Sequence, residues 1–462
     1  MRILRVPAAC VLLLSCVLTG SLAGPAPAGA TGCLPELIVA DPDAQAHSAP
    51  GQGALYSLLM DEDGPPRVRP QPVLTRLPAI PMGPIARADI DRDGCVDLVV
   101  GSPSLSAVPL VDSPDFGYSP EGDGYAQIVW GGEPEPGRFR PSTTLVPALA
   151  GLKGHFGWSV AASAGVVAVG APYEDAPEAA DSGAVYVFRL RGREVLGTPR
   201  RVTQDSPGVQ GNGETGDLFG WSLALGSLGG DPARPDLAVG APYETDDGAG
   251  RQETGVGTAQ AGAVTVLRDV DAQATPRGEQ FRLPSAGARF GYALASGAWE
   301  GSDWLAAGAP GVDTVRLFAT PAGGELLPVR DIRGHGAYGF SLALTGGDLV
   351  IGAPYGVPPY GAAPGSGTVT VTSLDGDSVA LTRGAGPRDR FGWAVAGAGA
   401  GWVLAGAPDR GTTGSVALVP MGGGETVWLA PGDGYVPQPP GLTARRRPHE
   451  ISTAVDFGGS VG

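Results

Sequence analysis

A run of alternating aspartates between residues 89 and 97 is the strongest chemical pattern in the sequence. The run reads Asp-Ile-Asp-Arg-Asp-Gly-Cys-Val-Asp, which places carboxylates at loop positions 1, 3, 5 and 9 and glycine at position 6. Calcium is a hard cation that takes about six to eight oxygen ligands, and alternating aspartates on a tight loop direct their oxygens toward one point. Gly94 permits the sharp turn, and the Cys95 carbonyl can supply the oxygen at position 7. The pattern predicts a calcium loop, and the alternative is a solvated acidic turn.

The loop is not an EF-hand. Position 12, where an EF-hand has glutamate, is Val100, and strand-like apolar residues rather than helices flank the loop. We therefore expect a modest calcium affinity, with a dissociation constant of about 10⁻⁴ to 10⁻³ M, as in other extracellular modules. The hairpin at residues 229–236 keeps only two acids, so we expect one good site rather than several.

The elements that position this loop are predicted by an internal repeat, which also determines the fold class. Gly-Ala-Pro follows a short apolar run five times and precedes a glycine-led strand at most of these sites. These turns begin at Gly170, Gly240, Gly308, Gly352 and Gly406. An aromatic-Gly pair stands upstream of each turn, at Phe156-Gly157, Phe219-Gly220, Phe290-Gly291, Tyr338-Gly339 and Phe391-Gly392. Many short strands at regular spacing predict an all-β propeller.

Two degenerate copies precede the five clear ones and bring the expected number of blades to seven. The copy around 37–42 lacks its aromatic-Gly strand, but the chain ends with a similar segment, Phe457-Gly458-Gly459-Ser460-Val461. A ring of sheets exposes an edge unless it closes. We therefore predict a seven-bladed β-propeller whose C-terminal strand joins the N-terminal blade and closes the ring.

These paired motifs resemble the FG-GAP repeat of integrin alpha-chain propellers and related bacterial secreted proteins. The resemblance covers residues 34–462 and implies a calcium-stabilised binding or adhesion module. It also implies that the aromatic of each pair packs between blades. The calcium ligands that it implies are Asp89, Asp91, Asp93, Cys95 through its backbone carbonyl, and Asp97.

The first 30 residues have the pattern of an export signal. A basic start precedes an apolar run, and Ala28-Gly29-Ala30 fits a small-residue cleavage site, so the mature chain is expected to begin near Thr31. The rival interpretation is a lipoprotein site at Leu13–Cys16. No later stretch has the roughly 18 apolar residues that a membrane span needs. We expect residues 1–30 to be a signal peptide and residues 31–462 to be a secreted or cell-surface propeller.

Charge and cysteine content narrow the classes of partner. The formal net charge of −16 disfavours nucleic acid and anionic lipid surfaces. The signal contains two of the four cysteines, which leaves Cys33 and Cys95 as an even pair in an oxidising compartment. Either these two form a bridge or they are separate thiols, and we predict the bridge.

No catalytic motif is evident in the sequence, so two function classes remain. Ser159 and Ser222 follow the aromatic-Gly pairs and are interpreted as repeated strand residues rather than nucleophiles. The loops at 104–123, 173–181, 243–261 and 355–366 contain tyrosines and acids, among them Glu174 and Glu244, and are expected to share one face. We predict that this monomeric protein is a binding module for an unidentified protein or carbohydrate ligand on that acidic face. The alternative is an extracellular hydrolase or lyase that uses paired acids of the same face.

Overall fold

The structure is a computed structural model, and its described residues all lie in the second of two compact units, Met1–Thr31 and Gly32–Gly462. The described ranges are 38–41, 54–59, 67–68, 84–103, 123–132, 142–148, 153–245, 257–272, 277–321, 324–355, 365–376, 379–383, 386–398, 401–411, 414–421 and 425–430. The expected signal at 1–30 and the expected closing strand Phe457–Val461 lie outside these ranges.

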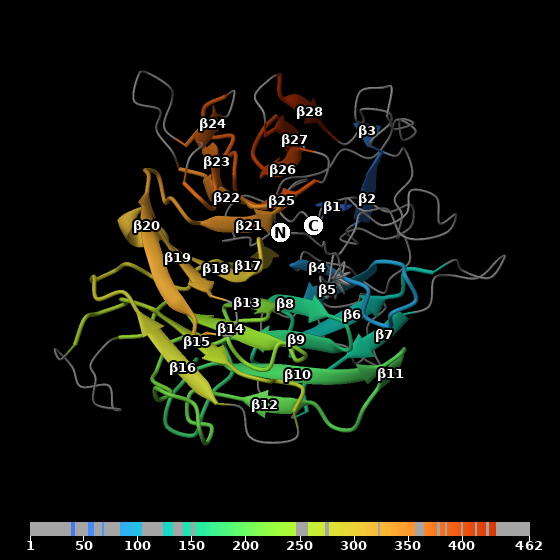
Figure 1. Ribbon diagram of the computed structural model, residues 1–462, viewed down its shortest axis with the longest axis vertical. Helices are drawn as coiled ribbons and strands as arrows, with labels where there is room; N and C mark the ends of the chain where they lie inside the picture. The colour runs from blue at the N-terminus through green and yellow to red at the C-terminus, as the bar shows by residue number, and fades with distance from the viewer. Residues whose placement is uncertain are drawn as a thin grey trace, which may run out of the picture. The chain divides into compact units, whose positions relative to one another are not determined.

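The described chain forms antiparallel sheets in which consecutive strands pair, as a propeller requires. Six sheets have four or more strands, and we call them blades I to VI (Figure 1). Blade I has β4 (Ile85–Ala88), β5 (Asp97–Ser102), β6 (Tyr125–Val129) and β7 (Ser142–Leu145). Blade II has β8 (Ser159–Ser163), β9 (Val166–Ala171), β10 (Ala184–Arg191), β11 (Glu194–Val195) and β12 (Arg200–Val202).

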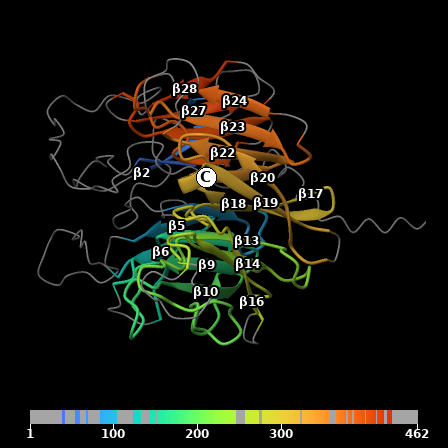
Figure 2. The same ribbon diagram turned by 90° about the vertical axis from the view of Figure 1, so that its left-hand side faces the viewer.

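The remaining blades repeat this order. Blade III has β13 (Ser222–Gly226), β14 (Asp236–Ala241), β15 (Ala263–Leu267) and β16 (Gly278–Arg282). Blade IV has β17 (Leu294–Trp299), β18 (Ser302–Ala309), the 3-10 turn η1 (Pro310–Val312), β19 (Thr314–Thr320) and β20 (Leu327–Arg333). Blade V has β21 (Ser341–Thr345), β22 (Asp348–Ala353), β23 (Thr368–Ser373) and β24 (Val379–Arg383). Blade VI has β25 (Val395–Gly397), β26 (Trp402–Ala407), β27 (Ser415–Pro420) and β28 (Val427–Leu429). Figure 2 shows β22, β23 and β24 one beside the next.

The prediction of seven blades is wrong, because the described residues form six. The N-terminal segment forms a three-stranded sheet of β1 (Ile38–Asp41), β2 (Ala54–Leu59) and β3 (Arg67–Val68). Val39 of this sheet is buried in one cluster with Leu404 and Leu418 of blade VI. The expected number of seven assumed one blade for each Gly-Ala-Pro-like turn. A blade also needs an inner strand before the strand that leads into that turn, and the described N-terminal sheet begins with the latter strand, β1.

The two glycines of the repeat meet across each junction between blades, which explains why the motif needs them. A Cβ placed on Gly240 of blade III would lie 2.0 Å from the carbonyl oxygen of Gly291, in the aromatic-Gly pair of blade IV. Gly170 of blade II has the same relation to Gly220, at 2.1 Å. No side chain fits at such a distance, so only glycine allows the sheets to approach this closely.

The aromatic of each pair is buried between blades, which confirms the prediction made from the repeat. Phe219, Phe290 and Phe391 are 0% exposed. Phe219 packs in one cluster with residues from both blade II and blade III, including Val185 and Val239. Burial of such rings contributes much of the apolar area that holds neighbouring sheets together.

Candidate functional site

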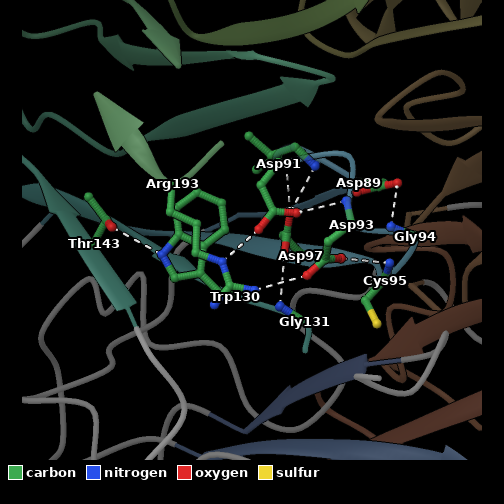
Figure 3. Close-up of polar contacts among 11 residues, drawn as sticks. Asp89, Asp91, Asp93, Gly94, Cys95, Asp97, Trp130, Gly131, Thr143 and Arg193 are labelled. Carbon is green, nitrogen blue, oxygen red and sulfur yellow. Dashed lines mark hydrogen bonds and ion pairs between the residues drawn. The ribbon is translucent and has the colours of Figure 1, made fainter. Parts of the chain in front are cut away.

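The aspartate loop joins β4 to β5 in blade I (Figure 3). Ile90 anchors it, because its side chain is 1% exposed and its carbonyl accepts a hydrogen bond from the Gly165 backbone nitrogen at 3.0 Å. Arg92 and Gly94 have positive φ angles of 63° and 87°, which turn the chain back on itself. The loop is therefore a tight turn fixed at its base by the core of the neighbouring blade.

Asp97 is the buried carboxylate of the loop. It is 0% exposed and accepts hydrogen bonds from the backbone nitrogens of Ile90 at 2.8 Å and Gly131 at 2.7 Å. Burial, with a smaller contribution from the charge of Asp91, raises its pKa to about 6 against the opposing effect of these bonds. A positive charge in the loop would offset that cost of burial.

The structure brings three of the predicted ligands together. Carboxylate oxygens of Asp89, Asp91 and Asp97 all lie within 4.8 Å of one another, and no other such trio of metal-ligating residues occurs in the described part of the chain. Asp89 Oδ2 accepts a hydrogen bond from Gly94 at 3.1 Å. Its Oδ1 is buried without a hydrogen-bond partner among the described residues. That orphaned acceptor belongs to one of the three carboxylates that a cation would use.

Asp93 lies outside this trio and contacts an arginine of blade II. Arg193 stands in the turn between β10 and β11 and donates to Asp91 Oδ2 at 2.6 Å and to Asp93 Oδ2 at 2.9 Å. These contacts raise the pKa of the guanidinium. The same group lies 5.5 Å from the ring centre of Trp130, whose Nε1 donates to Thr143 (Figure 3). No sequence pattern pointed to Arg193, which is about a hundred residues away from the loop.

Blade III shows which part of the loop is a structural device. Asp236 is 0% exposed and, like Asp97, accepts backbone hydrogen bonds at 2.8 Å, from Leu228, Gly230 and Asp269. The rest of that hairpin has no counterpart of the aspartate trio within the described ranges. The buried aspartate therefore organises both hairpins, whereas the additional carboxylates are particular to blade I.

A second feature is a row of aromatic rings, which we call the aromatic arc. Its members each follow an aromatic-Gly pair: Trp158, Trp221, Tyr292, Phe340 and Trp393. Neighbouring rings are 4.8, 5.4, 5.0 and 4.8 Å apart between centroids, so the row runs unbroken from blade II to blade VI. All five side chains are half-buried. The arc was not predicted from the sequence, although an aromatic residue directly after each pair was a usable signal.

Tyrosines at the Gly-Ala-Pro turns extend this arc. Tyr173 and Tyr243 pack edge-on against Trp158 and Trp221 at 5.2 and 5.9 Å between centroids. Burial, with a smaller effect of the neighbouring Tyr243, raises the pKa of Tyr173 to about 12. The phenol of Tyr173 therefore stays a neutral hydrogen-bonding group at physiological pH.

The acidic face expected from the loops lies largely outside the described residues. Most of 104–123, 246–256 and 356–364 lies outside the described residues. Glu174 and Glu244 are 1% and 2% exposed, so they are not solvated acids. Glu174 accepts hydrogen bonds from Tyr186 and Arg201, whereas Glu244 accepts one from Gln204. These two side chains make hydrogen bonds in the interior of the blades and do not form a binding surface.

Glu244 also faces a buried acid. Asp217 is 1% exposed, and burial together with the charge of Glu244 raises its pKa to about 9. A pair of carboxyl groups buried this completely does not have access to a polymer substrate. It therefore gives no support to the hydrolase or lyase alternative.

The serines after the aromatic-Gly pairs join blades, as their assignment to strand structure predicted. Ser159 Oγ donates to the Gly220 carbonyl at 2.6 Å, and Ser222 Oγ donates to the Gly291 carbonyl at 2.6 Å. Each hydroxyl is held at a junction between sheets, which is a structural role.

Comparison with known proteins agrees with the repeat. A family described as FG-GAP repeat matches residues 147–188, which contain the first clear aromatic-Gly and Gly-Ala-Pro pair. The chain is a β-propeller that carries an FG-GAP repeat at residues 147–188. Human phosphatidylinositol-glycan-specific phospholipase D is 30% identical over 179 residues, which are 36% of this FG-GAP propeller and 19% of that protein. The propeller thus spans about a fifth of the length of the curated relative that it matches.

Solved propellers resemble the FG-GAP propeller only distantly. A putative 6-phosphogluconolactonase from Bacteroides uniformis has 11% identity and a TM-score of 0.47. The match covers 85% of this chain and 94% of the lactonase chain. A periplasmic gluconolactonase from Pseudomonas aeruginosa has 14% identity and a TM-score of 0.46, with coverage of 86% and 97%. A six-bladed fucose-binding lectin from Aleuria aurantia has 11% identity and a TM-score of 0.40, with coverage of 78% and 98%. Within the described residues, no helix is long and apolar enough to span a bilayer.

Proposed function

We propose that this FG-GAP propeller is a secreted binding module that calcium stabilises through the aspartate loop. The observation that carries the calcium assignment is the convergence of Asp89, Asp91 and Asp97 within 4.8 Å, together with the orphaned Asp89 Oδ1. All of these donors are hard oxygens, the ligand type that calcium prefers. Asp93 and the Cys95 carbonyl are the further ligands that the loop pattern predicts.

Calcium would supply positive charge to a part of blade I that is rich in acid. Asp97 already joins the loop to the end of β6 through its backbone bonds to Ile90 and Gly131. Neutralisation of its neighbours would therefore stabilise the aspartate loop within blade I, which is a structural rather than a catalytic role.

Calorimetric titration of the mature protein with calcium tests this assignment. The double variant Asp91→Ala, Asp93→Ala should lose the binding heat. Asp231→Ala is a matched control, because Asp231 Oδ1 accepts the Ala233 nitrogen at 3.0 Å just as Asp91 Oδ1 accepts the Asp93 nitrogen at 3.1 Å. Unchanged calcium binding in the double variant would refute the assignment.

We further propose that the ligand, a protein or a carbohydrate, binds over the aromatic arc rather than over acids of the loop face. Aromatic side chains provide large contact areas and little conformational entropy is lost when they are buried. The phenols of Tyr173 and Tyr243 supply hydrogen-bonding groups beside the rings. Glu174 and Glu244 are buried and are not available for this purpose.

Affinity capture from the native extracellular fluid, with and without a chelator, tests the binding role. Trp221→Ala should reduce the captured material, whereas Trp299→Ala, outside the arc, should not. Equal capture by both variants would show that the arc is not the binding surface. Secretion, the start of the mature chain near Thr31 and the Cys33–Cys95 bridge stay predictions, which mass spectrometry of the exported, unreduced protein would check.

A further inference from the structure

Arg193 brings a positive charge of blade II to the aspartates of blade I. Its side chain leaves the turn between β10 and β11 and reaches Asp91 and Asp93 across the junction (Figure 3). The Asp91 side chain is 5% exposed and that of Asp93 is 34% exposed. The Asp91 carboxylate is therefore largely screened from solvent, whereas the Arg193 side chain, at 41% exposed, keeps part of its surface in water.

The guanidinium is held in this position from two sides. Its Nε and Nη2 bond to two different carboxylates at 2.6 and 2.9 Å, which uses the planar fork of donors that arginine offers. Its flat face lies 5.5 Å from the centre of Trp130, and that ring is 1% exposed and fixed by a hydrogen bond to Thr143. This is a favourable cation–π arrangement.

Arg193 therefore uses oxygens that the calcium loop needs. Asp91 Oδ2 accepts a hydrogen bond from its Nε, and Asp93 Oδ2 accepts one from its Nη2, while Asp93 lies outside the trio of Asp89, Asp91 and Asp97. A divalent ion bound to the same carboxylates would stand within a few ångströms of the guanidinium, where two like charges repel each other strongly.

We propose that Arg193 is an internal cation that competes with calcium for Asp91 and Asp93 and thereby sets the calcium affinity of the loop. This inference rests on the proposed calcium function. When calcium is absent, Arg193 joins blade II to the loop. When calcium binds, the guanidinium leaves the carboxylates and the β10–β11 turn is released from blade I.

The test compares calcium affinity by calorimetry in the wild-type mature protein, Arg193→Gln and Arg193→Lys. Removal of two ion pairs and one cation–π contact should tighten calcium binding by about tenfold in Arg193→Gln. The calcium affinity of Arg193→Lys should lie between those of wild type and Arg193→Gln, because lysine keeps the charge but lacks the planar fork of donors. Arg191→Gln is the matched control on the same hairpin: its side chain is 77% exposed and pairs only with Glu194 among the described residues. That control should bind calcium like the wild type.

Hydrogen exchange gives a second readout that does not depend on the variants. Calcium should speed exchange of the backbone amides at 191–196 in the wild-type protein. If wild type binds calcium and Arg193→Gln binds with equal or lower affinity, competition is refuted while the calcium site stands. If neither protein binds calcium, the calcium assignment itself fails. Thermal unfolding covers the case in which the substitution weakens the fold. In the presence of a chelator, Arg193→Gln should melt at a lower temperature than wild type. Added calcium should narrow the difference between the two melting temperatures.

Discussion

Replacement of Gly240 by alanine tests the contact that joins successive blades. The new Cβ would stand 2.0 Å from the Gly291 carbonyl oxygen and 2.4 Å from Ser222 Oγ. Blades III and IV would have to separate locally by about 1 Å, and overpacking of this kind costs about 1–3 kcal/mol. The shift also breaks the Ser222–Gly291 hydrogen bond, which is worth about 0.5–1.5 kcal/mol. We expect a loss of about 2–4 kcal/mol in the free energy of unfolding.

Differential scanning calorimetry measures this loss as a shift of the melting temperature. The unfolding entropy of a chain of this size makes that cost a decrease of about 2–5 °C. Gly297→Ala is the matched control, since Gly297 also lies in an inner strand but its Cβ would meet nothing nearer than Leu344 Cβ, at 3.3 Å. If Gly240→Ala melts no lower than Gly297→Ala, the close approach of the two glycines does not limit packing and the explanation of the repeat is wrong.

Three further predictions concern single side chains. Because burial and Glu244 raise the pKa of Asp217 from 3.8 to about 9, the folded state keeps a proton that the unfolded state loses, so stability falls as the pH rises through that window. Asp217→Asn should therefore lose less stability than wild type between pH 5 and pH 9 in urea unfolding, and parallel pH profiles would contradict this account. Ser222→Ala should lower stability by about 1 kcal/mol, because the Gly291 carbonyl loses its donor, and a neutral result in the same unfolding assay would show that water replaces the hydroxyl. Asp89→Asn should abolish the rise in melting temperature that millimolar calcium gives the wild type. At ten to a hundred times the dissociation constant, bound calcium adds about 1–3 kcal/mol to the free energy of unfolding. An equal rise in both proteins would exclude Asp89 as a ligand.

The repeat in the sequence predicted the propeller because its glycines and aromatics act locally and at every junction. Gly240 and Phe219 carry the same contacts wherever the motif recurs, so their role follows from type and spacing alone. The number of blades did not follow, because a turn resembling Gly-Ala-Pro does not guarantee the inner strand of its sheet. The N-terminal copy has the turn, and its described residues form three strands.

The candidate site was predicted only where its residues are neighbours in sequence. The aspartates of the loop could be recognised from their spacing, but Arg193 could not, since it reaches them from another blade. The burial of Glu174 and Glu244 was also hidden, because an acid after a Gly-Ala-Pro-Tyr turn looks solvated until the third strand covers it. Long-range placement of charged side chains is thus the part that a single sequence conceals.

The contact between paired glycines has a direction, and this bears on how such a chain can change in evolution. Gly170 of blade II meets Gly220 of blade III, and Gly240 of blade III meets Gly291 of blade IV, always in the order of the chain. Each blade therefore offers one kind of edge to the preceding blade and another kind to the next. A duplication or deletion with its ends between repeats leaves blade edges that match. One with its ends inside a repeat leaves two edges that do not fit. The natural unit of gain and loss in this chain is accordingly a whole repeat, from one aromatic-Gly pair to the next.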